Sequence, residues 1–267
     1  RLGHVRLHAG GEAEAVPGQR HAGLSTELDV VRVMRLTPEL VASCHRDVPE
    51  TKGHPAHDYF EDADYDRATA AVLAARPEGP LWLFAYGSLL WRPEFEAIEA
   101  RRAVANGWQR GFSMQILSHR GTPEQPGYMM CLDPGGECEG LALRLREEDA
   151  TAQIRILLYR EIGSHEALDG VRWIEVKSST GPLKALTFYA RPDRLPLYQP
   201  NRSLDEIAHG LARACGHWGS GAAYLYNTVS HLEDLGIHDP RLWELQERVA
   251  AEIERIHAGQ AAGDAGR

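Results

Sequence analysis

Two short segments hold the residue types that could do chemistry. Tyr86-Gly87-Ser88-Leu89 interrupts an apolar run with a glycine and a hydroxyl, and Arg160-Glu161 places a carboxylate where a predicted helix ends. A glycine lets the backbone approach a ligand closely, and successive N–H groups in such a turn form a concave anion site. A carboxyl group flanked by apolar residues has a raised pKa and can act as general acid and base near neutral pH.

Each segment also has a purely structural interpretation. The glycine turn can simply end a core strand, and Arg160 with Glu161 can form an ion pair on the surface. Ser88 has no histidine at a spacing that indicates a catalytic triad, and the nearest one, His119, lies beside Arg120 in a loop. The sequence contains no G-x-S-x-G, H-E-x-x-H, Walker or dinucleotide-binding glycine motif. Local residue types therefore leave both interpretations open.

Metal-binding patterns in the chain are weak. His45, His54 and His57 lie near Asp58, but without a recognised ligand spacing. We expect this stretch to be solvated, as part of an acidic surface segment over residues 47–66.

The composition is that of an ordinary globular protein with negative charge. The chain has 267 residues, enough for a sizeable core, and a formal net charge of −9. A nucleic-acid binder needs a basic face to neutralise phosphates, so this charge argues against that class. No apolar run approaches the roughly 20 residues that cross a bilayer, and no secretory signal is visible. We expect a cytoplasmic protein without membrane contact, whose widely spaced cysteines stay reduced: Cys44, Cys131, Cys138 and Cys215.

The centre of the chain predicts closely spaced strands. Leu81–Ala85 is typical of a strand buried on both faces, and it leads directly into the Gly87 turn. Tyr128–Leu132 and Cys138–Leu145 are predicted to pair as a hairpin across Asp133-Pro134-Gly135-Gly136. Further strands are expected at Trp108–Ile116, Val171–Val176 and Leu183–Ala190. Several short strands with little helix between them indicate a strongly curved sheet or a small barrel.

Helices are predicted around this β-rich centre. Ser203 with Glu206 three residues later forms a capping box at the start of one of them. Glu147–Tyr159 is predicted to be helical, and the face expected to pack carries Ala152, Ile156 and Tyr159. The other expected helices are Pro38–Cys44, Tyr65–Arg76, Ser220–Leu235 and Arg241–His257.

Four segments are expected along the chain. Residues 1–33 have no sustained period, and Met34 opens a stretch with the form of a native start. We therefore expect residues 1–33 to be disordered or a non-native extension. Residues 34–80 form a helical and loop segment, 81–257 the domain with both chemical segments, and 258–267 a fraying tail.

Five motifs occur in an order that resembles a known family. They are FAYGSLLWRPEF at 84–95, SHRGTPEQPG at 118–127, REI at 160–162, RW at 172–173 and a YL–LGI–D pattern at 224–239. Over about residues 81–249 the chain resembles the ChaC-like family of γ-glutamylcyclotransferases, in its glutathione-specific branch. The YGSL motif alone is a weak signal, but five collinear matches are specific.

This resemblance implies an α+β protein with the γ-glutamylcyclotransferase-like fold, a small mixed β-barrel with surrounding helices. It implies cleavage of glutathione to 5-oxoproline and cysteinylglycine, without a metal or an organic cofactor. In that family the YGSL loop holds the γ-glutamyl group, and the glutamate of the RE motif is the acid and base. The matching residues here are Tyr86, Gly87, Ser88, Leu89 and Glu161.

Two more side chains are candidates for substrate contact. Arg120 is suited to bind a substrate carboxylate bidentately, whereas it or His119 can instead stabilise its loop. Tyr224 can reach the pocket or remain a half-buried helix tyrosine. The chain also departs from the family's usual pattern, which bears on substrate preference. No tyrosine follows shortly after Glu161, and Ala222-Ala223 stand where an asparagine is common.

Two alternatives to a glutathione-specific enzyme stay open. One is a cyclotransferase for other γ-glutamyl amino acids or γ-glutamylamines, and the other is a non-catalytic γ-glutamyl-binding regulator. The presence of Glu161 argues against the regulator, because binding alone needs no general base. The expected partner is a small-molecule substrate, and the sequence predicts no oligomeric state.

Overall fold

The computed structural model describes residues 32–50 and 57–265. The chain divides into two compact units, residues 1–33 and 34–267, and every helix and strand named below lies in the second. The expectation for residues 1–31, and the part of the histidine cluster formed by His54, fall outside the described residues.

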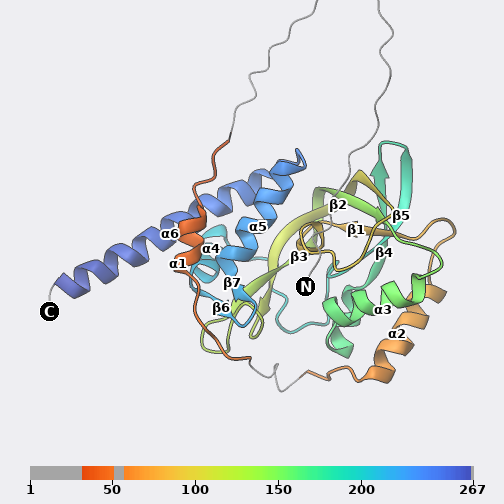
Figure 1. Cartoon of the computed structure of the whole chain (residues 1–267), viewed down its shortest axis with the longest axis horizontal. Helices are drawn as coiled ribbons and strands as arrows, with labels where there is room; N and C mark the ends of the chain where they lie inside the picture. The colour runs from red at the N-terminus through yellow and green to blue at the C-terminus, as the bar shows by residue number, and fades with distance from the viewer. Residues whose placement is uncertain (1–31, 51–56, 266–267) are drawn as a thin grey trace, which may run out of the picture. The chain divides into compact units, whose positions relative to one another are not determined.

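Five strands close into a barrel (Figure 1). Around the barrel they are β1 (Trp82–Ala85), β3 (Gly127–Arg144), β2 (Glu99–Ile116), β4 (Arg172–Ser178) and β5 (Gly181–Thr187). β1 completes the closure by pairing parallel to β5, whereas the other neighbours are antiparallel. All four residues of β1 are buried, as the apolar run predicts. The α+β class and the small mixed barrel are confirmed.

The long pair of β2 and β3 contains an irregularity where the sequence predicts a hairpin. β3 continues through Asp133-Pro134-Gly135-Gly136 and pairs with β2 on both sides of it, so the predicted hairpin is wrong. Gly135 and Gly136 have φ values of 108° and 63°, and Gly107 on β2 has a φ of 80° at the same point of the ladder. Glycines with such φ values suit a β-bulge as well as a turn, because they have no Cβ to clash.

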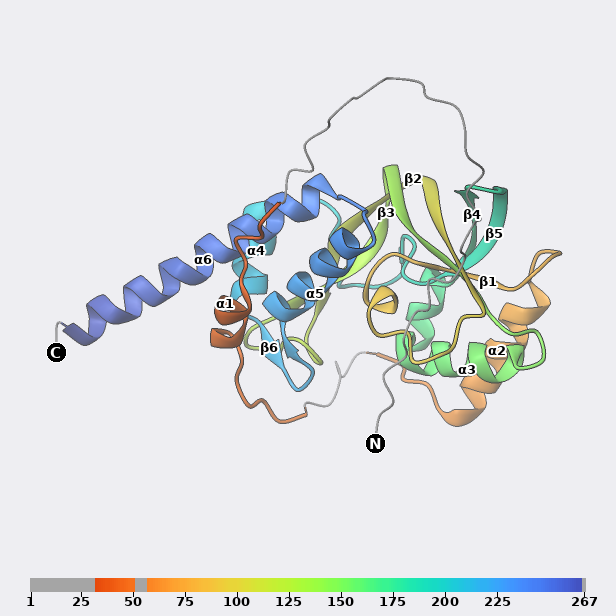
Figure 2. The same cartoon turned by 45° about the horizontal axis from the view of Figure 1, so that its top comes forward.

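The helices form two groups beside the barrel, which both views separate (Figures 1 and 2). In one group α2 (Asp62–Ala74) packs against α3 (Ala150–Glu161). The other group contains α1 (Pro38–Ser43), α4 (Leu204–Arg213), α5 (Gly221–Asp234) and α6 (Pro240–Ala265). α6 continues past the predicted end at His257, through most of the segment where we expected a tail.

The predicted capping box of α4 is confirmed. The Ser203 hydroxyl accepts a hydrogen bond from the Glu206 N–H, and the Glu206 carboxylate accepts one from the Ser203 N–H. α2 begins earlier than predicted, because Glu61 and Asp64 form a reciprocal cap three residues ahead of the apolar pattern. The acidic stretch therefore supplies the first turn of a helix and is not a loop throughout.

The buried face of α3 is not the one that the sequence predicts. Ile154 and Leu157 are fully buried, whereas Ile156 and Tyr159 are 48% and 67% exposed. Both sets have helical spacing, so periodicity alone could not choose between them. Seven residues after Ile154, the buried stripe reaches Glu161, the last residue of the helix. The helix that ends at this carboxylate therefore turns it toward the protein interior.

Candidate active site

β1 leads directly to Tyr86, whose backbone carbonyl and side-chain hydroxyl both form hydrogen bonds with other parts of the chain. The buried Arg110 donates from Nε to the Tyr86 carbonyl at 2.7 Å, and the Tyr86 hydroxyl donates to the Phe188 carbonyl at 2.8 Å. Arg110 is itself held by Asp239 at 3.0 Å. Burial raises the pKa of Tyr86 well above its usual value, so this phenol stays neutral. Tyr86 therefore fixes where the following turn begins.

Gly87 allows the turn to approach two side chains closely. A Cβ at this position would lie 3.3 Å from the Tyr224 hydroxyl oxygen and 3.4 Å from the Met130 sulfur. The chain then forms a 3₁₀ turn over Ser88–Leu90, in which the Leu90 N–H donates to the Gly87 carbonyl at 2.9 Å. The first N–H groups of a helical turn have no acceptor within the turn, so they are free to bind an anion.

Glu161 stands at the end of α3 as half of a buried ion pair. Its Oε1 lies 2.9 Å from Nε of Arg160, and the two side chains are only 12% and 11% exposed. Arg160 and Glu161 do form an ion pair, but the pair is buried, so the interpretation as a surface pair is wrong. Burial raises the pKa of Glu161, the positive charge of Arg160 opposes the rise, and Glu94 adds to it. A carboxyl group with a raised pKa is better suited to take up and return a proton than an ordinary surface carboxylate.

One cavity brings most of the predicted site residues together. It encloses about 330 Å³ of empty space, including its mouth, and is lined by the whole YGSL segment together with Glu161 and Tyr224. Tyr224 is buried, so the alternative of a half-buried helix tyrosine is wrong. Burial raises the pKa of Tyr224, and the nearby charge of Glu161 raises it further. The cavity thus joins a backbone turn, a carboxylate and a neutral phenol.

Arg120 lies behind this wall and does not line the cavity. Its guanidinium carbon is 5.4 Å from the ring centre of Tyr224 and 6.0 Å from that of Trp91, as in cation–π contacts. Nη1 donates to the Ser220 carbonyl at 3.3 Å. No carboxylate among the described residues pairs with it, and burial lowers the pKa of its guanidinium. Its contact with a substrate carboxylate stays a prediction, and His119 is an exposed neighbour in the same loop.

Residues 81–252, more than half of the chain, match the family described as ChaC-like protein. The chain belongs to this family. The glutathione-specific γ-glutamylcyclotransferase of Escherichia coli is 37% identical over 178 residues, covering 66% of this chain and 76% of the relative. The enzyme of the same name from Schizosaccharomyces pombe is 26% identical, covering 67% and 97%. A crystal structure of a yeast γ-glutamylcyclotransferase specific to glutathione superposes with a TM-score of 0.58 at 20% identity, covering 66% and 97%, which indicates the same fold.

Sequence reasoning missed four residues of the cavity wall in this ChaC-like chain. They are Met129, Met130, Phe188 and Tyr189. Tyr189 donates its hydroxyl to the backbone carbonyl of Glu161 and has a positive φ of 55°, rare for a residue with a side chain. Its place at the end of a predicted strand was the one available signal, because pockets form where barrel strands end. The two methionines lie on β3, and nothing in their sequence context distinguishes them from core residues.

Within residues 32–50 and 57–265, no three histidine, cysteine or acidic side chains are placed to share a metal ion. Among the helices that the structure describes, none is long and apolar enough to cross a bilayer.

Proposed function

We propose that this ChaC-like protein is a γ-glutamylcyclotransferase that cleaves glutathione to 5-oxoproline and cysteinylglycine. The observation that carries the proposal is the single cavity lined by both the glycine turn at Gly87 and the buried carboxyl group of Glu161. The names of the relatives at 37% and 26% identity support the same activity.

The reaction needs no nucleophile from the protein. The α-amine of the γ-glutamyl group attacks its own γ-carbonyl carbon, a new C–N bond closes the five-membered ring, and the bond to the cysteinyl nitrogen breaks. Glu161 accepts a proton from the α-ammonium group and returns it to the departing nitrogen. The attacking nitrogen gives up its second proton as the ring closes, and the released amine takes up that proton, so atoms and charges balance. The main task of the cavity is to fold the glutamyl chain so that amine and carbonyl meet, which is a proximity effect.

The glycine turn supplies partial positive charge, on its backbone N–H groups, for the negatively charged groups of the substrate. The free N–H groups at Gly87–Leu89 bind the α-carboxylate or the oxyanion that develops on the γ-carbonyl. The Ser88 hydroxyl adds a donor or acceptor at the same place and is not the nucleophile. Tyr224 lines the cavity beside the turn, where a Cβ at Gly87 would lie 3.3 Å from its hydroxyl oxygen.

The experiment that tests the mechanism is Glu161→Gln. We expect 5-oxoproline release from glutathione to fall to the background level, because an amide cannot accept the ammonium proton. Glutathione binding, measured by calorimetry, should persist, since the turn and Tyr224 are unchanged. Turnover at the wild-type rate would contradict the assignment of Glu161.

A second assay separates the alternative substrates. The wild-type protein is incubated in turn with glutathione, γ-glutamylalanine and a γ-glutamylamine, and 5-oxoproline is measured from each. We expect glutathione to give the highest kcat/KM. A preference for either of the other two would identify the broader cyclotransferase, and no release from any would favour the non-catalytic binding protein.

We also propose a cytoplasmic location, where glutathione is abundant and thiols stay reduced. All four cysteines are free, and three of them are buried. Such buried, unpaired thiols fit a reducing compartment.

A further inference from the structure

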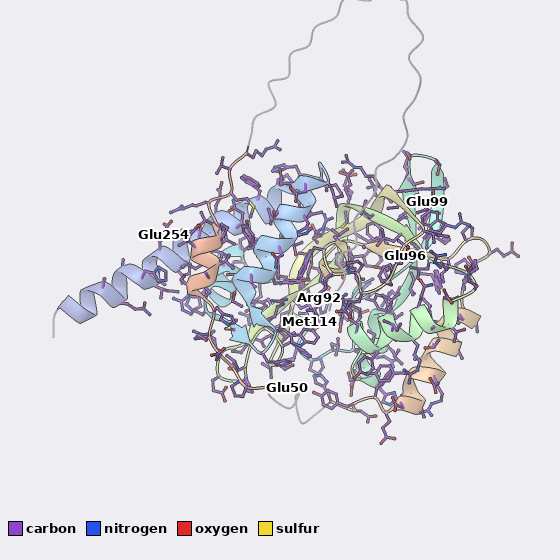
Figure 3. The ribbon with its side chains drawn as sticks, viewed as in Figure 1. Glu50, Arg92, Glu96, Glu99, Met114 and Glu254 are labelled. Atoms are coloured by element: carbon purple, nitrogen blue, oxygen red, sulfur yellow. The ribbon has the colours of Figure 1, made fainter. Side chains whose placement is uncertain are left out.

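Arg160 connects the two halves of the site through one guanidinium group. Nε contacts Oε1 of Glu161 at 2.9 Å, and Nη2 donates to the Ser88 hydroxyl oxygen at 3.3 Å. Nη1 donates to the backbone carbonyl of Arg92, which lies two residues beyond the 3₁₀ turn and is labelled in Figure 3. Nη1 of Arg160 also lies 3.9 Å from Oε1 of Glu94. One side chain of α3 therefore grips the carboxylate and the substrate turn together.

This pairing is not ordinary helix geometry. Adjacent residues of a helix do not face each other, so two successive side chains meet only when something redirects one of them. Here the helix ends at once, because Ile162 is already extended with φ −123° and ψ 115°. The contacts of Arg160 with Ser88 and Arg92 bend its side chain back across the end of the helix. The position of the pair is thus set by the turn and not by α3 alone.

We propose that Arg160 is a positioning residue that holds the Glu161 carboxylate in register with the Gly87–Leu89 turn and places a positive charge beside it. This rests on the proposed function. A guanidinium is a rigid planar fork, so its contacts with Glu161 and with the turn cannot shift independently. A lysine, which presents a single rotatable charge, could keep the charge but not the register.

Every described group that acts on Glu161 is consistent with this role. Glu94, on the loop after the 3₁₀ turn, disfavours a charged Glu161, and so does burial. The facing hydroxyls come from the segments that follow β1 and β5 and from α5, and all three are neutral because their pKa values are raised: Tyr86, Tyr189 and Tyr224. Arg160 supplies the opposing positive charge. Removing Arg160 takes away the group that lowers the pKa of Glu161, so the pKa of this carboxyl group should rise further.

The test is the pH dependence of kcat/KM for 5-oxoproline release by Arg160→Met and Arg160→Lys. For Arg160→Met we expect the acidic limb to move to higher pH, with a loss of about tenfold or more at pH 6.5 that shrinks at pH 8.5. Arg160→Lys should keep the limb near its wild-type position but lower kcat, because the charge remains and the link to Ser88 is lost. A loss by the same factor at every pH in Arg160→Met would overturn the proposal.

Arg155→Met is the matched control on the same helix. Arg155 forms an exposed pair with Asp66 at 2.7 Å, so its removal should leave the pH profile superimposable on that of the wild type. A shift of equal size in Arg155→Met would show a general charge effect and would also overturn the proposal.

A readout without turnover separates this proposal from the proposed function. The Glu161 carboxyl carbon is followed by ¹³C NMR titration in the wild type and in Arg160→Met, with Glu161→Gln assigning the signal. We expect its midpoint to rise in Arg160→Met but not in Arg155→Met. If the wild type releases no 5-oxoproline, the proposed function fails, while this titration still decides whether Arg160 controls the ionisation of Glu161.

Discussion

Two glutamates of this protein, each paired with arginine, have pKa values that are shifted in opposite directions. Glu161 has one arginine partner at the barrel, and burial raises its pKa. Glu252, where α6 meets α4, is gripped through both oxygens by Arg255 at 2.8 Å and again by Arg213 at 2.5 Å. These hydrogen bonds hold the pKa of Glu252 at about 2, despite some burial.

The difference lies in how completely each carboxylate is satisfied. Two guanidinium groups and the His209 ring surround Glu252, and a carboxylate with this many partners stabilises the fold but is poorly available for chemistry. At Glu161 the arginine occupies one oxygen, and no described residue donates to Oε2. Incomplete pairing costs stability and leaves an oxygen without a donor on a residue that lines the cavity. A carboxylate becomes a base here because its partners are few.

The largest expected contrast is therefore in activity. Glu161→Gln should lower kcat/KM for glutathione by about 10²- to 10⁴-fold, the range for losing a general acid and base. Glu252→Gln should leave kcat/KM within about twofold, because its partners lie away from the cavity. Steady-state assays at pH 7.5 measure both. Equal losses in the two variants would show that the substitution acts through the fold and would remove the distinction.

The second contrast concerns what holds each region in place. Leu158 is fully buried under the end of α3, so Leu158→Ala should lower the free energy of unfolding by about 2–5 kcal/mol. Ile156 is 48% exposed on the same helix, and Ile156→Ala should change it by about 0.5 kcal/mol at most. Urea denaturation at fixed pH measures both. Reversed magnitudes would mean that the face predicted from the sequence is the packed one.

How much of this could be predicted from the sequence depended on whether the signal was local. The β1 strand, the glycine turn and the Ser203 cap each carry their information within a few residues, and the structure has them as predicted. The turn signal at Asp133-Pro134-Gly135-Gly136 was equally local but ambiguous, because the same glycines serve a bulge once a long partner strand is present. That partner, β2, was predicted only in part.

The sequence is compatible with a buried Glu161, but it is equally compatible with an exposed one. Ile154, Leu157 and Glu161 share one helical stripe, while Ile156 and Tyr159 belong to a second, and both are apolar enough to pack. Contact with the barrel chooses between them, and that contact is not local. The cavity walls were harder still to predict, since they come from β3, α3, α5 and the segments that follow β1 and β5, which meet only when the barrel closes.

A smaller effect is expected at the turn itself. Gly87→Ala places a Cβ 3.3 Å from the Tyr224 hydroxyl, tighter than usual contact, so Tyr224 or the turn must move by a few tenths of an ångström. Because misplacement of a catalytic geometry by 1 Å costs roughly 10²-fold, we expect kcat/KM to fall about tenfold. The control is Gly163→Ala, which lies just beyond α3 and has no atom within 4 Å of its new Cβ, so kcat/KM should be unchanged. An unchanged kcat/KM in Gly87→Ala would mean that the turn does not need glycine for close approach.

The smallest expected effect tests the other glutamate through pH. The pKa of Glu252 is lowered from 4.5 to about 2, so its stabilising contribution is fully present above about pH 4.5 and is lost as the pH falls toward 2. Lowering the pKa by about 2.5 corresponds to about 3 kcal/mol of folding stability at most, and partial exposure of the side chain reduces this to about 1–2 kcal/mol. The difference in unfolding free energy between wild type and Glu252→Gln should therefore be constant from pH 5 to 8 and shrink below pH 4.5.

Glu254→Gln is the control for this pH dependence. Glu254 lies two residues further along α6 (labelled in Figure 3) and pairs with Arg35 at 2.6 Å, with its side chain 47% exposed. An exposed pair contributes about 0–1 kcal/mol, so its difference curve should stay small at every pH. If Glu252→Gln gave the same small, flat curve, saturation by two arginines would not distinguish the structural carboxylate from the catalytic one, and the contrast with Glu161 would rest on burial alone.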